Sequence, residues 1–267
     1  MTFTPLLPIG GYAGWAFLQR TKAVQETAFV KQASIVRDET YYREKIGTID
    51  TAEQLVSDKR LLRITLQAFG LEADVNNTFF VRKVLEGSVL DTKALANRLA
   101  DKRYGALSNA FGFGDFAVPR NKISTFADGI LSSWKARTFE VAVGQQSEPI
   151  RLAMNAEREL VALATSTMSE DSKWFTLMGQ TPLRTVFETA FGLPKAFGAL
   201  DIDKQLEVLK DKARQFAGDD TVGQFNEPAN LQKLIRIYLV RSELSGASTT
   251  SVSGSAALQL LQSFNRR

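Results

Sequence analysis

The sequence predicts an all-α fold in which duplicated multi-helix units pack as a helical array or bundle. The first reason is periodicity, because apolar residues recur at helical spacing in most segments of the 267-residue chain. The second is the lack of a hairpin pattern, since no Asn-Gly or Asp-Gly pair separates two alternating apolar segments. The third is an internal repeat, in which residues 61–71 align without gaps on residues 183–193 at an offset of 122 residues.

The repeat contains a short word, Ala-Phe-Gly, that occurs four times in the chain. Two of these copies, at 68–70 and 190–192, are the aligned ones, and a leucine follows each of them. A glycine after an aromatic residue is typical of a helix end, because glycine adopts the left-handed conformation without strain. We therefore expect equivalent helix ends at Gly70 and Gly192, with Phe69 and Phe191 both buried in the core.

Helical periods and capping residues divide the chain into segments. Prolines and glycines predict an irregular arm over residues 1–11. Aspartates that can accept an early backbone N–H predict short helices that start at Asp50, Asp58, Asp91 and Asp101. Asp50 with Glu53 resembles a capping box. The longer helices are expected over 14–32, 34–46, 122–144, 147–167, 171–179, 182–191, 202–217 and 228–243.

The domain organisation follows from the repeat and from one shift of composition. With 44% hydrophobic residues, a chain of this length can bury one large core or two small ones. After Glu243 the segment Ser245–Ser255 is mostly small and polar, which predicts a flexible linker before a short amphipathic helix with Leu258, Leu261 and Phe264. We expect this helix to dock on its own domain, and docking on a partner is the alternative. The expected divisions are 1–33, N-terminal arm and helix; 34–118, first helical repeat unit; 119–243, linking helices and a diverged second unit; and 244–267, linker and C-terminal helix.

Composition excludes several classes of chemistry. The chain has no histidine and no cysteine, which removes Ser-His-Asp triads, disulfides and metal centres built on those ligands. We therefore expect no cofactor and no transition metal. Asp201, Asp203 and Glu207 could gather carboxylates around Mg²⁺ or Ca²⁺, but a helix cap at Asp201 is the simpler interpretation.

Charge and hydropathy narrow the expected partners and compartment. The net charge is +4 without any block of like charges, so we expect no nucleic-acid partner. No apolar segment is long enough to span a membrane. The first basic residue is Arg20, and proline and glycine interrupt the apolar stretch before it, so we expect no Sec signal. The expectation is a cytoplasmic protein, with signal-less export left open.

The segment from Arg37 to Phe113 carries a set of specific words. They are Arg37-x-Glu39-Thr40-x-Tyr42, Ile46-Gly47, Asp58-x-Arg60-Leu61, Ala68-Phe69-Gly70-Leu71-Glu72, Phe80-Val81-Arg82-Lys83-Val84-Leu85-Glu86, Leu95-Ala96-Asn97-Arg98-Leu99, Asp101-x-Arg103-Tyr104 and Ala110-Phe111-Gly112-Phe113. In these words the chain resembles a bacterial family known as domain of unknown function 1217. The resemblance implies an alphaproteobacterial protein, often with more than one copy of the region, and flagellar gene neighbourhoods for some members. It implies no catalytic residues.

One of these words has a physical interpretation of its own. Asp-x-Arg followed by an apolar residue occurs at Asp58 and at Asp101, and it predicts an N-cap, a polar tether and a core anchor. The alternative is that Arg82, Arg98 and Arg103 converge to bind an acidic group of a partner. The candidate partner-binding residues are therefore Arg82, Arg98, Arg103, Leu258, Leu261 and Phe264.

Two functions from different classes remain open at this point. The favoured one is a non-enzymatic scaffold or an assembly and interaction protein with a protein partner, with a link to the flagellum suggested by the family resemblance. The alternative is a small-molecule binding protein or hydrolase that uses carboxylate and arginine side chains in a groove between the two repeat units. A flat surface with exposed apolar side chains favours the first, and a deep polar cleft favours the second. Partner identity and oligomeric state do not follow from the sequence.

Overall fold

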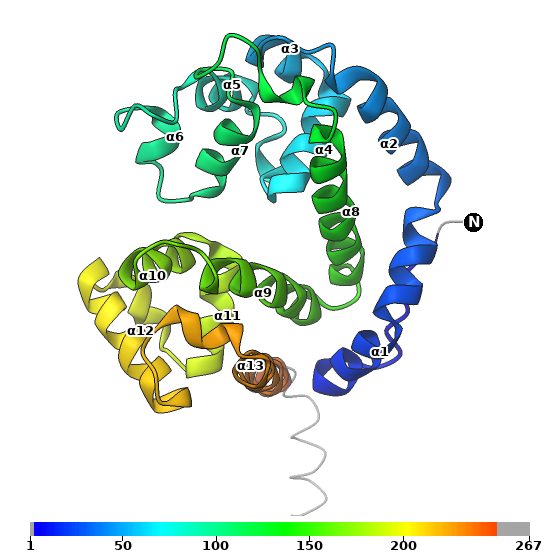
Figure 1. The fold of residues 1–267 in the computed structure, drawn as a ribbon. Coiled ribbons are helices and arrows are strands. Elements are labelled where there is room, and N and C mark those ends of the chain that lie inside the picture. Colours follow the sequence, from blue (N-terminus) through cyan, green and yellow to red (C-terminus); the bar gives the residue numbers. More distant parts are fainter. Residues whose placement is uncertain (1–2, 250–267) are drawn as a thin grey trace, which may run out of the picture.

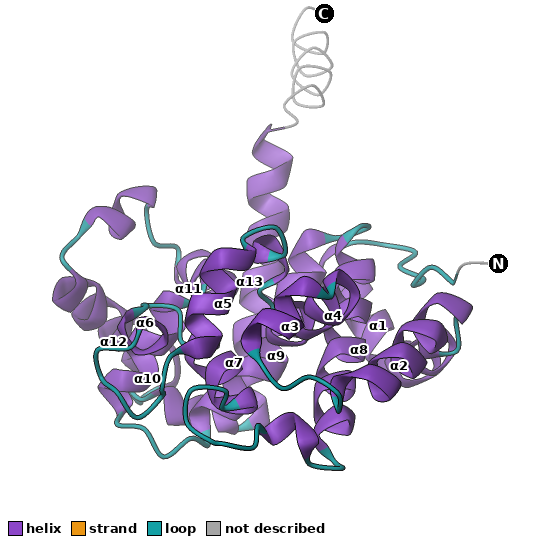
Figure 2. Ribbon diagram, turned by 90° about the horizontal axis from the view of Figure 1, so that it is seen from above, coloured by secondary structure: helices purple, strands orange, loops and turns teal. Residues whose placement is uncertain are grey.

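The computed structural model describes residues 3–249 and confirms the all-α prediction. This part of the chain contains helices and loops and no strand (Figure 2). The α-helices are α1 (Gly11–Val30), α2 (Ala33–Ile46), α3 (Ala52–Ser57), α4 (Lys59–Phe69), α5 (Thr78–Glu86), α6 (Leu95–Arg98), α7 (Arg103–Phe111), α8 (Phe126–Gly144), α9 (Glu148–Ala164), α10 (Glu170–Gly179), α11 (Thr181–Phe191), α12 (Ile202–Ala217) and α13 (Pro228–Thr249). Short 3₁₀ turns are η1 (Glu72–Asp74), η2 (Arg120–Lys122), η3 (Lys195–Ala199) and η4 (Val222–Asn226).

The helices form a curved array with two groups that face each other (Figure 1). Helices α2 to α7 lie at one end, helices α9 to α13 lie at the other, and α8 connects the two groups. Helix α1 follows the outer side of the curve and packs against α8, α9 and α13. Among the described residues, the first helix therefore contacts the last one, and this contact ties the two ends of residues 3–249 together.

Helix α9 is the central element, because it contacts α8, α11, α13 and η4. It begins as the sequence predicts, with the Ser147 hydroxyl accepting the N–H of Ile150. Its buried face combines large side chains with the fully buried Ala153 and Ala156. Small residues let neighbouring helices approach closely, so four of them, α1 included, pack around α9 in one continuous core.

The two aligned repeat segments end their helices in the same way. At the end of α4, Gly70 has φ 71° and the N–H of Leu71 donates to the Leu66 carbonyl at 2.8 Å. At the end of α11, Gly192 has φ 65° and Leu193 makes the corresponding bond, also at 2.8 Å. Both are Schellman ends, which need a residue with positive φ after the helix. The predicted duplication of the whole unit stays a prediction.

The expected burial of the two phenylalanines holds at one helix end only. Phe191 is buried at the end of α11 and packs on Phe187. Phe69 is half-buried and lies against the edge of the core. The Gly-terminated end therefore fixes the backbone in both places, whereas the neighbouring helices decide how deeply each ring is covered.

Two local predictions are corrected by the structure. The capping box of α3 uses Thr51 and Gln54 in place of Asp50 and Glu53: the Thr51 hydroxyl accepts the N–H of Gln54, and the Gln54 side chain accepts the N–H of Asp50 at 2.6 Å. The cap is moved by one residue, and the Gln54 side chain reaches back to the N–H of the residue before the N-cap instead of to the N-cap itself. Asp91 caps a turn through the N–H of Lys93, and the next helix starts only at Leu95.

The predicted linker begins too early. Helix α13 continues to Thr249, so residues 244–249 are helical. Serine and threonine have only slightly lower helix propensity than the apolar residues before them, and the packed first part of α13 supplies the nucleus from which the helix extends. The candidate residues Leu258, Leu261 and Phe264 lie outside the described residues.

We expect Phe187→Ala to destabilise the protein by about 3–5 kcal/mol, because a fully buried ring is lost. The Phe187 ring makes edge contacts with Trp174, Phe191 and Phe225, with ring centroids 5.2–5.7 Å apart. Thermal or urea unfolding measures the change. The matched control is Phe79→Ala, at a side chain that is 67% exposed, and it should cost less than about 1 kcal/mol. Equal losses for the two variants would contradict the assignment of Phe187 to the core.

Candidate functional site

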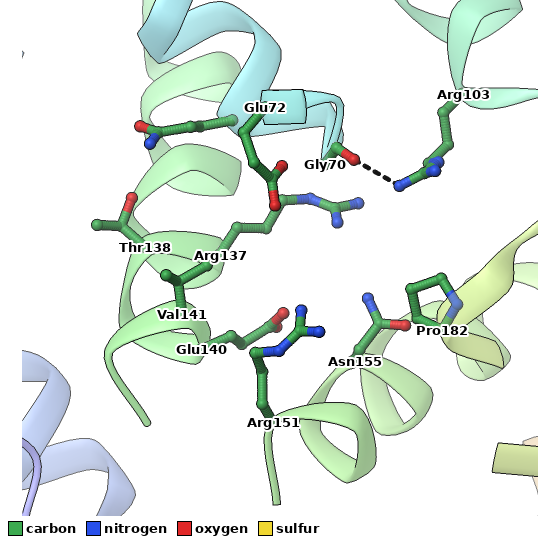
Figure 3. A pocket seen from close by; sticks show the side chains of 11 residues that line it. Gly70, Glu72, Arg103, Arg137, Thr138, Glu140, Val141, Arg151, Asn155 and Pro182 are labelled. Carbon is green, nitrogen blue, oxygen red and sulfur yellow. Dashed lines mark hydrogen bonds between the residues drawn. The ribbon is translucent and has the colours of Figure 1, made fainter. Parts of the chain in front are cut away.

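A polar cavity lies where the two groups of helices meet. Its open space is about 190 Å³. Figure 3 shows that side chains from α7, α8 and α9 point toward it, with the end of α4 and the start of α11 at its edges. The lining residues are Gln67, Gly70, Glu72, Arg103, Arg137, Thr138, Glu140, Val141, Arg151, Asn155 and Pro182.

A network of ion pairs between α8 and α9 forms one wall of the cavity. Glu140, which is only 7% exposed, accepts two hydrogen bonds from Arg158, at 2.8 and 2.9 Å. Arg158 also donates to Glu159. Arg137 donates from Nη2 to the same oxygen of Glu159 at 2.6 Å. Since burying a charge without a partner is costly, these four side chains hold one another in place across the helix pair.

Of the two arginines in this network, Arg137 is the one whose positive charge is stabilised less by its neighbours. Burial lowers the pKa of Arg137 below its usual value, and the positive charge of Arg158 lowers it further. For Arg158 burial acts in the same direction, but the bonds it donates to Glu140 raise its pKa. The Nε of Arg137 is buried and donates to no atom of the described residues. Arg137 therefore holds a partly uncompensated positive charge beside the cavity.

Asn155 extends this pattern on the next helix. Its side chain is buried, with 6% exposed, and its Oδ1 has no hydrogen-bond partner among the described residues. The amide nitrogen is also without a hydrogen bond in residues 3–249, and Figure 3 shows it facing the guanidinium groups of Arg137 and Arg151. A buried amide without partners is uncommon in native proteins and needs an explanation.

Arg151 adds another donor group to the cavity. It uses Nε and Nη2 on Glu148, one turn earlier in α9. Its Nη1 donates to no acceptor in the described part of the chain. These N–H groups come from two helices and face a common space.

Gly70 lets the arginines approach the end of α4. Its carbonyl accepts a hydrogen bond from Arg103 Nη1 at 2.5 Å (Figure 3). A Cβ atom at this position would lie 2.6 Å from Arg137 Nη1, so any other residue would force that side chain to shift, and the φ of 71° also favours glycine. An arginine approaches the end of α11 equally closely, since a Cβ atom on Gly192 would lie 2.5 Å from Arg241 Nη1. There the same Nη1 group donates to the carbonyl of Ala190 and caps α11.

The three arginines singled out in the sequence have separate environments. Arg82 pairs with Glu53 on α3 and with Glu86 in its own helix. Arg98 is exposed and pairs with no described residue. Of the three, only Arg103 lines the cavity, and it is held by Asp101 through a bidentate pair. The Asp-x-Arg interpretation holds at the first copy, where Asp58 is the N-cap of α4 and Leu61 is fully buried. At the second copy it holds in part: Asp101 accepts the N–H of Arg103, but the N-cap of α7 is Lys102 and Tyr104 is half-buried.

A second concave surface lies between the start of α7 and helices α10 and α12. This groove is more open and largely apolar, with a volume of about 670 Å³. The apolar side chains Met168, Phe175 and Ile202 line it and remain exposed. The groove residues are Ala100, Lys102, Met168, Ser172, Phe175, Thr176, Met178, Gly179, Arg184 and Ile202.

Asp201 has the capping role that the sequence favoured. Its side chain accepts the N–H of Asp203 at the start of α12. In residues 3–249 there is no group of three or more carboxylates placed to hold a metal ion. Among the helices of that same range, none is long and apolar enough to cross a membrane.

A comparison with models of known protein families identifies the family of this chain. The model of the family described as "Protein of unknown function (DUF1217)" matches residues 68–231, which is more than half of the chain. The chain belongs to this family. This confirms the resemblance read from the sequence words. A search of the curated proteins gives no match.

A crystal structure shows the same fold. Protein AGR_C_984 from Agrobacterium tumefaciens is similar to this DUF1217 protein with a TM-score of 0.73 and 24% identity. The similarity covers 91% of this chain and 99% of that one. The residues that the family model matches, 68–231, include both Gly-terminated helix ends and every charged residue of the cavity.

The sequence alone did not identify Arg137, Arg151 or Asn155. One signal was present: Asn155 interrupts a stretch of apolar residues in α9, between Met154 and Ala156. A polar residue at a core position of a helix is a candidate for function. The two arginines resembled ordinary surface charges, because their burial depends on how α8 and α9 pack.

We expect Gly70→Ala to destabilise this DUF1217 protein by about 1–2 kcal/mol, because its φ of 71° is unfavourable for alanine. The added methyl group should also displace Arg137. Chemical unfolding measures the loss of stability. Gly47→Ala is the matched control: Gly47 has helical φ and free space around it, so the change should be neutral or stabilise by about 0.4–1 kcal/mol. Equal effects would contradict the close approach at Gly70.

Proposed function

We propose that this DUF1217 protein is a non-enzymatic interaction protein that uses the groove beside α10 to bind a protein partner. The observation that carries the proposal is the exposure of three large apolar side chains, Met168, Phe175 and Ile202, on one concave surface. Exposed apolar side chains that gather on one surface mark interaction sites. Methionine is common at such surfaces because its side chain adapts to different partners.

The charges at the groove favour an acidic partner segment. Lys102 and Arg184 line it, and the lining residues of this described surface include no carboxylate, although Arg184 pairs with Glu188 in its own helix. Lys102 donates only to the backbone carbonyls of Asn97 and Leu99, so a carboxylate does not neutralise it. The occupant that fits is a segment of a partner protein with apolar side chains and neighbouring Asp or Glu residues.

The cellular setting belongs to the same proposal. We propose a cytoplasmic protein that takes part in assembly, with the flagellum as the first system to test. The support is the family membership together with the flagellar gene neighbourhoods that the resemblance implies. Deletion of the gene followed by a motility assay tests this part separately from the groove.

A second candidate function, small-molecule binding, is favoured by the polar cavity. Arginine and carboxylate side chains meet there between the two groups of helices, in the kind of place where the sequence alternative expected them. The cavity and the groove have no lining residue in common, so the two functions can be tested independently.

We predict that a photo-cross-linking amino acid in place of Phe175 captures a discrete partner in living cells. The cross-linked peptide, identified by mass spectrometry, should be apolar and acidic. Introducing Ile202→Glu should abolish capture, because a carboxylate in the groove repels an acidic segment and removes apolar contact.

The control places the same cross-linker at Phe79, which is exposed on α5 and does not line the groove. Val24→Glu, at an exposed position of α1, controls for the added charge. Equal capture from both cross-linker positions, capture that survives Ile202→Glu, or a basic captured peptide would contradict the proposal.

A further inference from the structure

We propose that the cavity between α4, α8 and α9 is a binding site for a small organic oxyanion, a carboxylate or a phosphate. The inference deepens the second candidate function and is independent of the groove. Its basis is a set of N–H donors on Arg137, Arg151 and Asn155 that face one space and have no acceptor there among the described residues.

The donors are held in place by other contacts, which is what a preformed site requires. Arg137 is fixed through Nη2 to Glu159, and Arg151 is fixed through Nε and Nη2 to Glu148. Each guanidinium therefore keeps its Nη1 group for another acceptor. Arginine presents its N–H groups in a rigid plane, so a carboxylate or phosphate oxygen can bind without reorganising the side chain.

Asn155 distinguishes a ligand site from a structural ion-pair cluster. A buried amide that serves the fold makes hydrogen bonds to backbone or side chains, as Asn121 does when it donates to the Ile46 and Ile49 carbonyls. Asn155 makes none within residues 3–249, although the residue is only 6% exposed. Its Oδ1 is the buried atom without a partner and needs a donor, so an anion does not satisfy it. The group that can bind an anion is Nδ2, which faces the two arginines and donates to no described residue.

The charge balance of the cavity favours an anion at the inner end. Three arginines and two glutamates line the space. Glu140 is fully used by Arg158, and Arg103 is fully used by Asp101 and the Gly70 carbonyl. Glu72 has no ion pair in the described structure, but it is exposed and lies near the rim. Inside the cavity, the positive charge that is only partly compensated is that of Arg137, so a negative group bound there stabilises it.

Size limits the ligand. A space of about 190 Å³ is smaller than the cavities that bind drug-sized molecules. Thr138, Val141 and Pro182 supply carbon surface to the lining. The site therefore fits one anionic head group on a short carbon body, or a free inorganic anion.

Calorimetric titration of the full chain at constant ionic strength tests the proposal with inorganic phosphate, acetate and succinate as probes. We expect saturable binding of at least one of them with one site per chain. Binding of phosphate alone assigns a phosphate ligand, and binding of acetate or succinate alone assigns a carboxylate. If none of the three binds saturably, the proposal is overturned.

Asn155→Leu is the decisive variant, because leucine has a similar shape and no donor. We expect anion binding to weaken at least tenfold, about 1.4 kcal/mol, with a melting temperature that is unchanged or higher. Unchanged anion binding in this variant, or a marked fall of the melting temperature, would overturn the proposal, since either result gives Asn155 a purely structural role.

Charge variants separate the site from general electrostatics. Arg151→Gln should weaken binding at least tenfold, whereas Arg98→Gln, which removes the same charge from an exposed side chain outside the cavity, should leave it unchanged. Glu72→Gln should tighten binding, because a nearby negative charge is removed. Equal weakening by the two arginine variants would overturn the proposal. Cross-linking at Phe175 should be the same in all these variants, so a failure here leaves the groove proposal intact.

Discussion

Four charged side chains between α8 and α9 fix the relation between the two groups of helices. Glu140 and Arg158 form a bidentate pair, and Glu159 joins Arg158 to Arg137. Removing Glu140, the most buried member, takes both hydrogen-bond acceptors from Arg158 and destabilises the pair, although solvent screens part of the loss because Arg158 is 31% exposed. Apolar side chains could fill the same seam more closely. The network therefore sets a particular spacing of α8 and α9, and the cavity lies directly beside it.

The same network explains why the cavity contains donors without acceptors. Both Arg137 and Arg158 donate to Glu159, so this one carboxylate neutralises the charge of Arg137 only in part. Gly70 brings a third arginine, Arg103, to the other side by accepting its hydrogen bond. At the corresponding helix end, Arg241 of α13 is exposed and donates to the Ala190 carbonyl of α11. Similar helix ends thus lead to a closed cap in one group of helices and an open polar site beside the other.

The groove and the cavity represent two kinds of recognition on one scaffold. The groove presents apolar side chains and two cations on an open surface, which is suited to a protein segment. The cavity is small and polar, and its donors are fixed by ion pairs, which is suited to a small anion. Both lie at junctions between helices that are distant in the sequence.

The sequence by itself determined the elements whose cause is local. The Schellman ends at Gly70 and Gly192 and the cap at Ser147 follow from residues within one helical turn, and the structure has them as predicted. Where neighbouring candidates compete locally, as in the capping box at Thr51, the sequence was wrong by one residue. Only the tertiary structure decided which polar residues share a site. Arg137 and Asn155 meet because α8 and α9 fold back on each other, and no local pattern encodes that long-range packing.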